Sequence, residues 1–214
     1  MPNKIQEYLV IHYKLFKLLF RAVKKGYLHD IGWINSYKTK TPVNISFQPI
    51  PWVTYSFISY IENRLNKKMS IFEYGSGNST LYFAEKVNHL ISVEHDKKWF
   101  ENILEIVPKN VELKQCDLQY GGDYCKTIVS TESKYSIIII DGRDRVNCIL
   151  NSTSSLSKDG VLILDDSERE EYQIGVIHLK QLGYKELDFW GIAPGIFYNK
   201  CTSIFYRDNN CLGI

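Results

Sequence analysis

From residue 69 onward the sequence alternates between short apolar runs and amphipathic segments, and this alternation limits the possible folds more than any other feature. Two of the runs, YSIIIIDG and GVLILDDS, are apolar at nearly every position until they reach glycine or aspartate. Strands that are apolar on both faces are typical of parallel sheets covered by helices on both sides. We therefore expect a doubly wound α/β fold with a mostly parallel sheet.

Seven segments carry the strand pattern. The first five are separated by helical segments and should lie parallel, because parallel strands need a crossover between them. The last two are joined only by a loop rich in glycine and proline, so they should pair antiparallel at one edge of the sheet. The predicted strands span residues 70–75, 89–96, 111–117, 135–142, 160–167, 184–190 and 202–208.

The first 50 residues differ from the rest in charge and pattern. Residues 1–40 hold eight of the 26 Lys and Arg residues but two of the 24 acids. Residues 4–25 have helical periodicity, with a basic stripe and a separate apolar stripe. We expect a basic helix and an irregular arm over residues 1–50, then an α/β domain over residues 51–214 whose first helix turns Trp52 and Tyr55 inward.

The helix of residues 4–25 has two interpretations. Its basic stripe suits peripheral contact with an anionic membrane surface. Its apolar stripe suits docking on the body of the protein or on a second copy in a homodimer. No apolar run has transmembrane length, and the first 25 residues lack a signal-peptide pattern, so a cytoplasmic location, including the inner membrane surface, is expected.

Charge and cysteine content narrow the classes of partner. The formal net charge of +2 argues against a dedicated nucleic-acid binder. The five cysteines are odd in number and form no Cys-x-x-Cys pair. This pattern favours reduced, mostly buried thiols over a disulfide framework or a zinc site.

A loop of small polar residues, GSGNST, follows the first predicted strand. Gly75 and Gly77 allow the backbone to approach a ligand closely, and Asn78 to Thr80 stand where a helix N-terminus would present free N–H groups. Glu94 ends the next predicted strand, the position from which a carboxylate accepts hydrogen bonds from ribose hydroxyls. Thr80 replaces the third glycine of a dinucleotide fingerprint, so a pyrophosphate cradle is incomplete.

The residues around this loop favour a cationic ligand. Glu73 stands two residues before the first glycine, where a carboxylate repels phosphates and attracts an ammonium or sulfonium. The runs EYGSGNST and VEHD resemble motif I and the acidic loop of class I S-adenosylmethionine (SAM)-dependent methyltransferases. The resemblance implies strand order 3-2-1-4-5-7-6, SAM binding by residues 51–214, and cofactor contacts from Glu73, Gly75, Ser76, Gly77, Ser79, Thr80, Glu94, His95, Asp117 and Asp141.

Acids also end the fourth and fifth predicted strands, and they leave two mechanisms open. In the first, Asp141, Asp165 and Asp166 bind a divalent ion such as Mg²⁺, as in the metal-dependent catechol and macrolide-sugar O-methyltransferases that the chain resembles. In the second, Asp141 or Asp144 is the general base and Arg143 assists. The run DGRDR departs from the catechol type and looks more like the glucuronoxylan methyltransferase group. Acceptor contacts are then expected from Arg143, Arg145, Trp52 and Tyr55.

The sequence thus predicts a SAM-dependent methyltransferase that O-methylates a sugar, glycan or similar small polyhydroxylated acceptor. One alternative is an NAD(P)-dependent sugar reductase or epimerase, but its Tyr-x-x-x-Lys spacing occurs at Tyr13–Lys17 and Tyr82–Lys86, which are poorly placed. The other alternative is a non-catalytic interaction protein with a SAM-type fold. The intact glycine loop and acidic strand ends argue against it.

Overall fold

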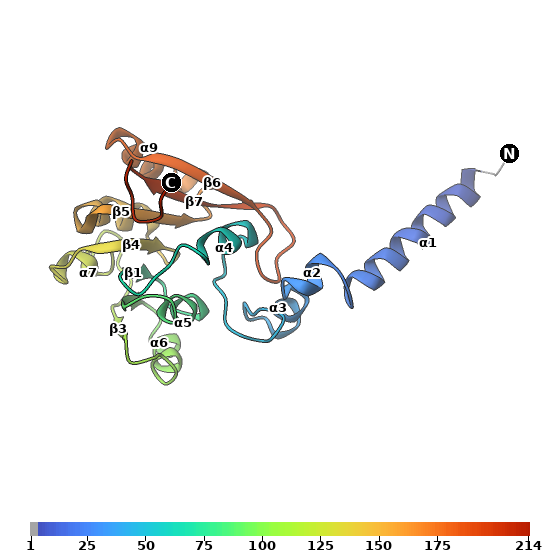
Figure 1. Cartoon of the computed structure of the whole chain (residues 1–214), viewed down its shortest axis with the longest axis horizontal. Coiled ribbons are helices and arrows are strands. Elements are labelled where there is room, and N and C mark those ends of the chain that lie inside the picture. The colour runs from blue at the N-terminus through green and yellow to red at the C-terminus, as the bar shows by residue number, and fades with distance from the viewer. Residues whose placement is uncertain (1–3) are drawn as a thin grey trace.

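The structure is a computed structural model that describes residues 4–214, so residues 1–3 of the predicted arm lie outside it. One seven-stranded sheet forms its centre (Figure 1). The strands are β1 (Ser70–Tyr74), β2 (His89–Glu94), β3 (Val111–Gln115), β4 (Tyr135–Ile140), β5 (Leu156–Asp165), β6 (Lys185–Gly191) and β7 (Lys200–Tyr206). The helices that flank the sheet are α4 (Tyr55–Ile61), α5 (Asn78–Ala84), α6 (Lys97–Leu104), α7 (Asp123–Ser130), α8 (Arg145–Ser152) and α9 (Gln173–Gln181).

The strand order is β3-β2-β1-β4-β5-β7-β6, which confirms the predicted topology. Neighbours from β3 to β5 pair parallel, and β7 pairs antiparallel with both β5 and β6. Chain order reverses between β1 and β4, so the loops at their carboxyl ends diverge and leave space for a ligand. The first residues of β7 therefore lie beside the last residues of β5, where Asp165 pairs with Thr202.

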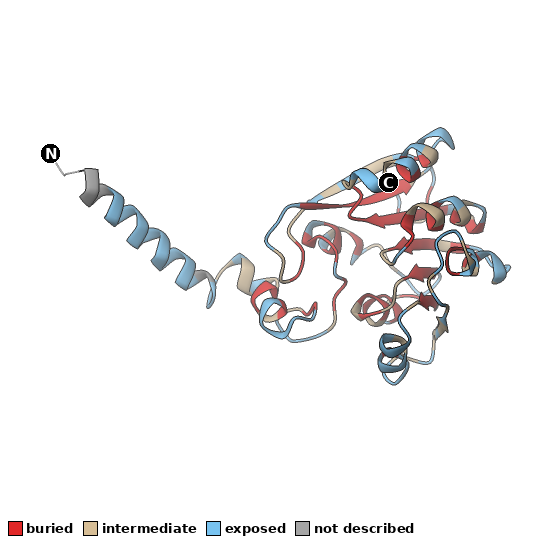
Figure 2. Ribbon diagram, turned by 180° about the vertical axis from the view of Figure 1, so that it is seen from behind, coloured by how far each residue is buried: buried red, intermediate tan, exposed pale blue. Residues whose placement is uncertain are grey.

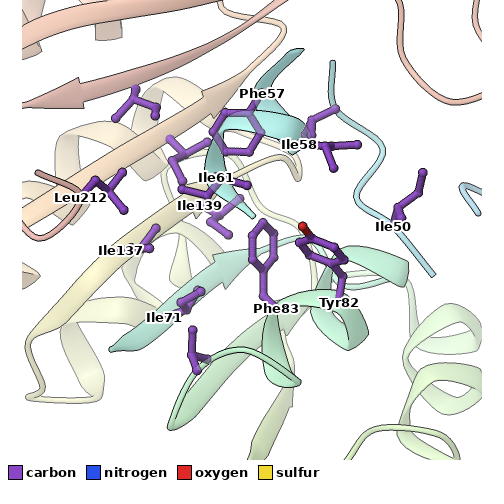
Figure 3. Close-up of a cluster of buried hydrophobic side chains, with 14 of the residues drawn as sticks. Ile50, Phe57, Ile58, Ile61, Ile71, Tyr82, Phe83, Ile137, Ile139 and Leu212 are labelled. Carbon is purple, nitrogen blue, oxygen red and sulfur yellow. The ribbon is translucent and has the colours of Figure 1, made fainter. Parts of the chain in front are cut away.

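Two apolar clusters cover the two faces of the sheet. The four consecutive isoleucines of β4 alternate between them, because neighbouring side chains of a strand point to opposite faces. Ile137 and Ile139 join the cluster under α4 and α5, which Figure 3 shows, whereas Ile138 and Ile140 join the cluster under α7, α8 and α9. Helices on both faces were predicted, and this burial explains why the central strands are continuously apolar.

The N-terminal arm is more regular than predicted from Gly26 to Ile50. It contains two short helices, α2 (Tyr27–Asp30) and α3 (Trp33–Thr39). Trp33, Ile34 and Ile50 belong to the same apolar cluster as α4 and α5, so this part of the arm packs into the body. These helices were not predicted, because each is shorter than three turns and glycine and proline residues interrupt the segment.

Helix α1 (Lys4–Ala22) projects away from the body (Figure 1). Figure 2 shows the helix as exposed, in contrast to the buried sheet. Within residues 4–214 no helix is both long and apolar enough to cross a membrane.

The expectation that Trp52 faces inward on the first helix of the body is wrong. Trp52 precedes α4 rather than facing inward on it, and its side chain is 44% exposed. The helix begins later because Thr54 is its N-cap. The indole N–H of Trp52 donates to the Pro194 carbonyl oxygen at 2.9 Å, which links the arm to the loop between β6 and β7.

Candidate functional site

A cleft of about 580 Å³ crosses the carboxyl ends of the central strands. The glycine loop after β1 forms one wall, and the ends of β4 and β5 form another. The arm around Pro42 and the loop before β7 add to the lining. The residues that line it are Lys40, Thr41, Pro42, Trp52, Gly75 to Ser79, Glu94 to Asp96, Trp99, Asp141 to Arg143, Arg145, Asp165, Asp166, Arg169, Tyr172, Ile196, Tyr198 and Lys200.

The fold itself requires glycine at position 75. Its φ of 91° is a conformation that side chains other than glycine rarely adopt. A Cβ at Gly75 would also lie 2.9 Å from the Cα of Gly142, and a Cβ at Gly142 would collide with the hydroxyl of Tyr124. The ends of β1 and β4 therefore meet backbone to backbone, which brings Asp141 close to the glycine loop. The sequence reading did not identify Gly142.

Glycine at position 77 has a different explanation. Its backbone is extended, with φ 166°, and a Cβ there would meet nothing nearer than the Trp99 ring at 3.9 Å. The fold therefore does not need glycine here. Gly77 thus lacks a side chain although the packing would allow one, and it lines the cleft. Both observations fit a loop that lets a ligand approach the backbone.

Glu73 lies beneath the glycine loop and outside the cleft lining. Its side chain is fully buried. One carboxylate oxygen accepts hydrogen bonds from Thr80 Oγ1 at 2.5 Å and Ser92 Oγ at 2.9 Å, and the other has no partner among the described residues. Thr80 Oγ1 in turn accepts the Gly77 N–H at 3.0 Å. Glu73 and Thr80 thus support the loop from below, and Glu73 is not among the residues that line the cleft.

Burial is the main reason that the pKa of Glu73 rises from 4.5 to about 7. The folded protein therefore binds a proton that the unfolded chain releases, so the free energy of unfolding should fall by about 3 kcal/mol as pH rises from 4.5 to 7. Glu73→Gln should remove this slope, as measured by urea unfolding across the same pH range. Parallel curves for the two proteins would contradict the assignment.

Glu94 lies at the end of β2, where the sequence predicted it, and it lines the cleft. One of its oxygens accepts hydrogen bonds from the N–H and hydroxyl of Ser76, at 3.0 and 3.1 Å. The other accepts the N–H groups of His95 and Asp96, both at 2.8 Å, and lies 2.9 Å from the His95 ring. Since a carboxylate has about four acceptor positions, a ribose hydroxyl would have to replace one of these donors.

Three acids and three bases form a charge cluster on the floor of the cleft. Lys200 lies 2.5 Å from Asp165 Oδ2 and 2.6 Å from Asp166 Oδ1. Arg145 lies 3.0 Å from Asp141 Oδ1 and 3.4 Å from Asp166 Oδ2, and Arg169 lies 2.7 Å from Asp166 Oδ2. The like charges that the sequence placed on one rim are therefore neutralised within the protein.

This cluster places a protein cation at the predicted metal site. The ammonium of Lys200 stands between Asp165 and Asp166, two of the three carboxylates that were expected to ligate an ion. Residues 4–214 contain no group of three or more His, Cys, Asp or Glu side chains arranged to hold a metal. Arg145, predicted as an acceptor contact, is buried and bonded to Asp141 and Asp166.

Asp141 is the acid of the cluster that a ligand could reach. Its side chain is 20% exposed, against 2% for Asp165 and 6% for Asp166. Burial, followed by the charge of Asp165, raises the pKa of Asp141 well above its ordinary value, although Arg145 opposes the shift. A carboxylate with a raised pKa is a better proton acceptor, which suits a general base.

The other predicted residues divide between the cleft and its surroundings. Asp144 is outside the lining, because its carboxylate accepts the Gly121 N–H at 2.8 Å and the Asn147 side chain at 2.7 Å. Asp117 is also outside and accepts a hydrogen bond from Gln115. Tyr55 lines a separate pocket next to Tyr82. Ser76, Ser79, His95, Arg143 and Trp52 do line the cleft.

Besides Gly142, the site contains contacts that the sequence did not predict, among them those of Lys200, Trp99 and Pro42. Lys200 opens β7 and reaches Asp165 and Asp166 because β7 runs antiparallel to β5. Trp99 donates its indole N–H to the Ser76 carbonyl oxygen at 2.7 Å and so borders the glycine loop. The Pro42 carbonyl accepts the Asn78 side chain at 2.7 Å, which ties the arm to the same loop. Each contact joins segments far apart in the sequence.

No protein-family model matches the sequence, and the search of curated proteins also found no match. Solved structures share the fold. A precorrin-6y C5,15-methyltransferase from Geobacter metallireducens GS-15 has a TM-score of 0.53 and 14% identity, over 70% of this chain and 87% of that one. An O-methyltransferase from Bacillus cereus in complex with SAH has a TM-score of 0.51 and 15% identity, over 65% and 74%.

A third solved structure is the O-methyltransferase TomG from Streptomyces achromogenes, involved in tomaymycin synthesis and solved with SAM. It has a TM-score of 0.51 and 12% identity, over 68% of this chain and 75% of that one. At this identity the likeness establishes the fold alone, which is the Rossmann-like fold of class I SAM-dependent methyltransferases.

Proposed function

We propose that this protein is a SAM-dependent methyltransferase that O-methylates a sugar or a similar small polyhydroxylated acceptor. The observation that carries the proposal is the cleft itself. It brings the bare backbone of Gly77 and the reachable carboxylate of Asp141 to the same end of a sheet with methyltransferase topology. The structural neighbours solved with SAM or SAH have the same fold.

The residues of the glycine loop would hold the cofactor. Gly77 leaves room beside the loop, Ser76 and Ser79 offer hydrogen-bonding groups, and Glu94 keeps the loop and the end of β2 together. When bound, SAM supplies an electrophilic methyl group that needs no further activation.

Asp141 would then take the proton from the acceptor hydroxyl as the oxygen–methyl bond forms. The proton passes to a carboxylate that Arg145 holds in place at 3.0 Å. Arg143, which is exposed at the rim, would face an anionic group of the acceptor such as a uronate. Trp52 and Tyr198 supply aromatic surface on the same cleft.

Thermal-shift titrations with SAM, SAH and NAD test the donor. We expect SAM and SAH to raise the melting temperature and NAD to leave it unchanged. A shift with NAD alone would favour the reductase alternative, and no shift with any of the three would favour a non-catalytic interaction protein.

Gly77→Val is the variant for the same titration. The added isopropyl group enters the cleft rather than the core, so the melting temperature of the free protein should stay near that of the wild type while SAM affinity falls by about tenfold or more. Ser154→Val is the control, because Ser154 is exposed just before β5, at the opposite end of the strand from Asp165. Equal SAM affinity in Gly77→Val would contradict the proposed cofactor position.

A further inference from the structure

Helix α1 exposes large apolar side chains over most of its described length. These side chains are between 50% and 67% exposed, and none of them is covered by the body of the protein. They are Tyr8, Leu9, Val10, Ile11, Tyr13, Leu15, Phe16, Leu18, Leu19 and Phe20. A continuous apolar surface of this kind on a projecting helix is unusual for a protein in water and indicates an interaction surface.

Glu7 is the one acid in the sequence of α1, and the charged residues that follow it in this segment are all basic. Lys14, Lys17, Arg21, Lys24 and Lys25 are all basic, and residues 8–25 contain no acid. Lys14, Lys17 and Arg21 fall on one stripe of α1, and Lys24 and Lys25 lie in the turn that follows the helix. The ammonium groups of Lys17 and Lys24 lie 4.8 and 5.5 Å from the rings of Tyr13 and Phe20, so the basic stripe borders the aromatic surface directly.

We propose that α1 lies in the plane of an anionic lipid surface and holds the protein there. In this position the apolar side chains enter the boundary of the acyl chains, and the Lys and Arg groups face lipid phosphates. The helix does not span the bilayer, because none within residues 4–214 is apolar enough over the required length.

The charge pattern favours lipid over a second copy of the chain. Helices that pair in a dimer place acids opposite bases beside an apolar seam of two positions in seven. Residues 8–25 offer no acid for such pairs, and apolar side chains cover consecutive positions such as Leu18, Leu19 and Phe20. A surface rich in anionic headgroups complements both features.

Flotation of the full-length protein with vesicles tests the proposal. We expect binding to vesicles that contain phosphatidylglycerol and much weaker binding to pure phosphatidylcholine vesicles. Because each basic residue near an anionic surface contributes about fivefold to partitioning, Lys14→Glu/Lys17→Glu/Arg21→Glu should lower it at least about a hundredfold, since three basic residues are lost and three acids are added. Phe16→Ser/Phe20→Ser should lower it on both kinds of vesicle.

The control carries the same change in charge on the body. Lys97→Glu/Lys98→Glu/Lys109→Glu alters exposed residues of α6 and the loop after it, and should bind vesicles as the wild type does. An equal loss in this control would show nonspecific attraction and overturn the proposal.

Light scattering identifies the competing outcome. If the wild type is a dimer that Phe16→Ser/Phe20→Ser dissociates, and if the wild type does not bind anionic vesicles, then α1 contacts a second copy of the chain. This result would overturn the proposal. The inference goes beyond the proposed function, since vesicle binding and SAM binding are measured separately and either can fail alone.

Discussion

Lys200→Met is expected to destabilise the protein by about 3–5 kcal/mol, because it leaves the buried carboxylate of Asp165 without its close cation. The Lys200 side chain is 4% exposed and lies 2.5 and 2.6 Å from Asp165 and Asp166. Although burial by itself lowers the pKa of this ammonium, the charges of Asp165, Asp141 and Asp166 raise it above its ordinary value. Lys200 therefore stays charged, and its removal is felt at all pH values where those acids are ionised. The measurement is urea unfolding at neutral pH.

Lys180→Met is the matched control. Lys180 also forms a close ion pair, 2.6 Å from Glu186, but its side chain is 53% exposed. Such a pair contributes about 1 kcal/mol or less, because water screens it. If Lys200→Met costs no more than Lys180→Met, the cluster is not the buried charge network that the structure describes.

A smaller replacement of the same residue, Lys200→Ala, tests the predicted metal site. Without the ammonium, Asp165 and Asp166 lose the cation between them, and two carboxylates together with water can bind a divalent ion. We expect Mn²⁺ to raise the melting temperature of Lys200→Ala and to leave the wild type unchanged. A rise in the wild type that a chelator reverses would restore the metal mechanism.

The sheet could be predicted because its pattern is local. β4 and the second half of β5 are continuous apolar runs, β3 alternates between apolar and polar residues, and the absence of a helix between β6 and β7 fixes their antiparallel pairing. The glycine loop could also be located, since Gly75 and Gly77 precede a helix directly. The sequence could not show that packing requires glycine at position 75 but not at position 77. The close approach of Gly75 to Gly142, which makes the difference, joins β1 to β4.

The charge cluster could be predicted only in part. The acids are visible as strand ends, but the bases come from the first turn of α8, the loop after β5 and the start of β7. Lys200 had a signal, a lone charge that opens a buried strand. Combining it with the antiparallel pairing of β7 would have placed it beside Asp165. The orientation of Asp144 toward Gly121 left no such signal, because it depends on a turn with φ 52°.

Asp141→Asn is expected to lower methyl transfer by about 10²–10⁴-fold, the usual loss when a general base is removed. The amide keeps the shape of the side chain but cannot accept the acceptor's proton. SAM affinity should stay close to that of the wild type. The measurement is SAH release with whichever of a panel of sugars, uronates and catechol the wild type methylates, together with calorimetric titration of SAM.

The pH dependence separates a base from a structural role. Since the pKa of Asp141 lies well above its ordinary value, wild-type turnover should fall as pH drops through that raised pKa, and the acid limb should vanish in Asp141→Asn. Asp123→Asn, an exposed change on α7, serves as the control. If Asp144→Asn instead loses turnover while Asp141→Asn keeps it, Asp144 is the residue that accepts the proton. The loop at Gly121 must then open to free the Asp144 carboxylate.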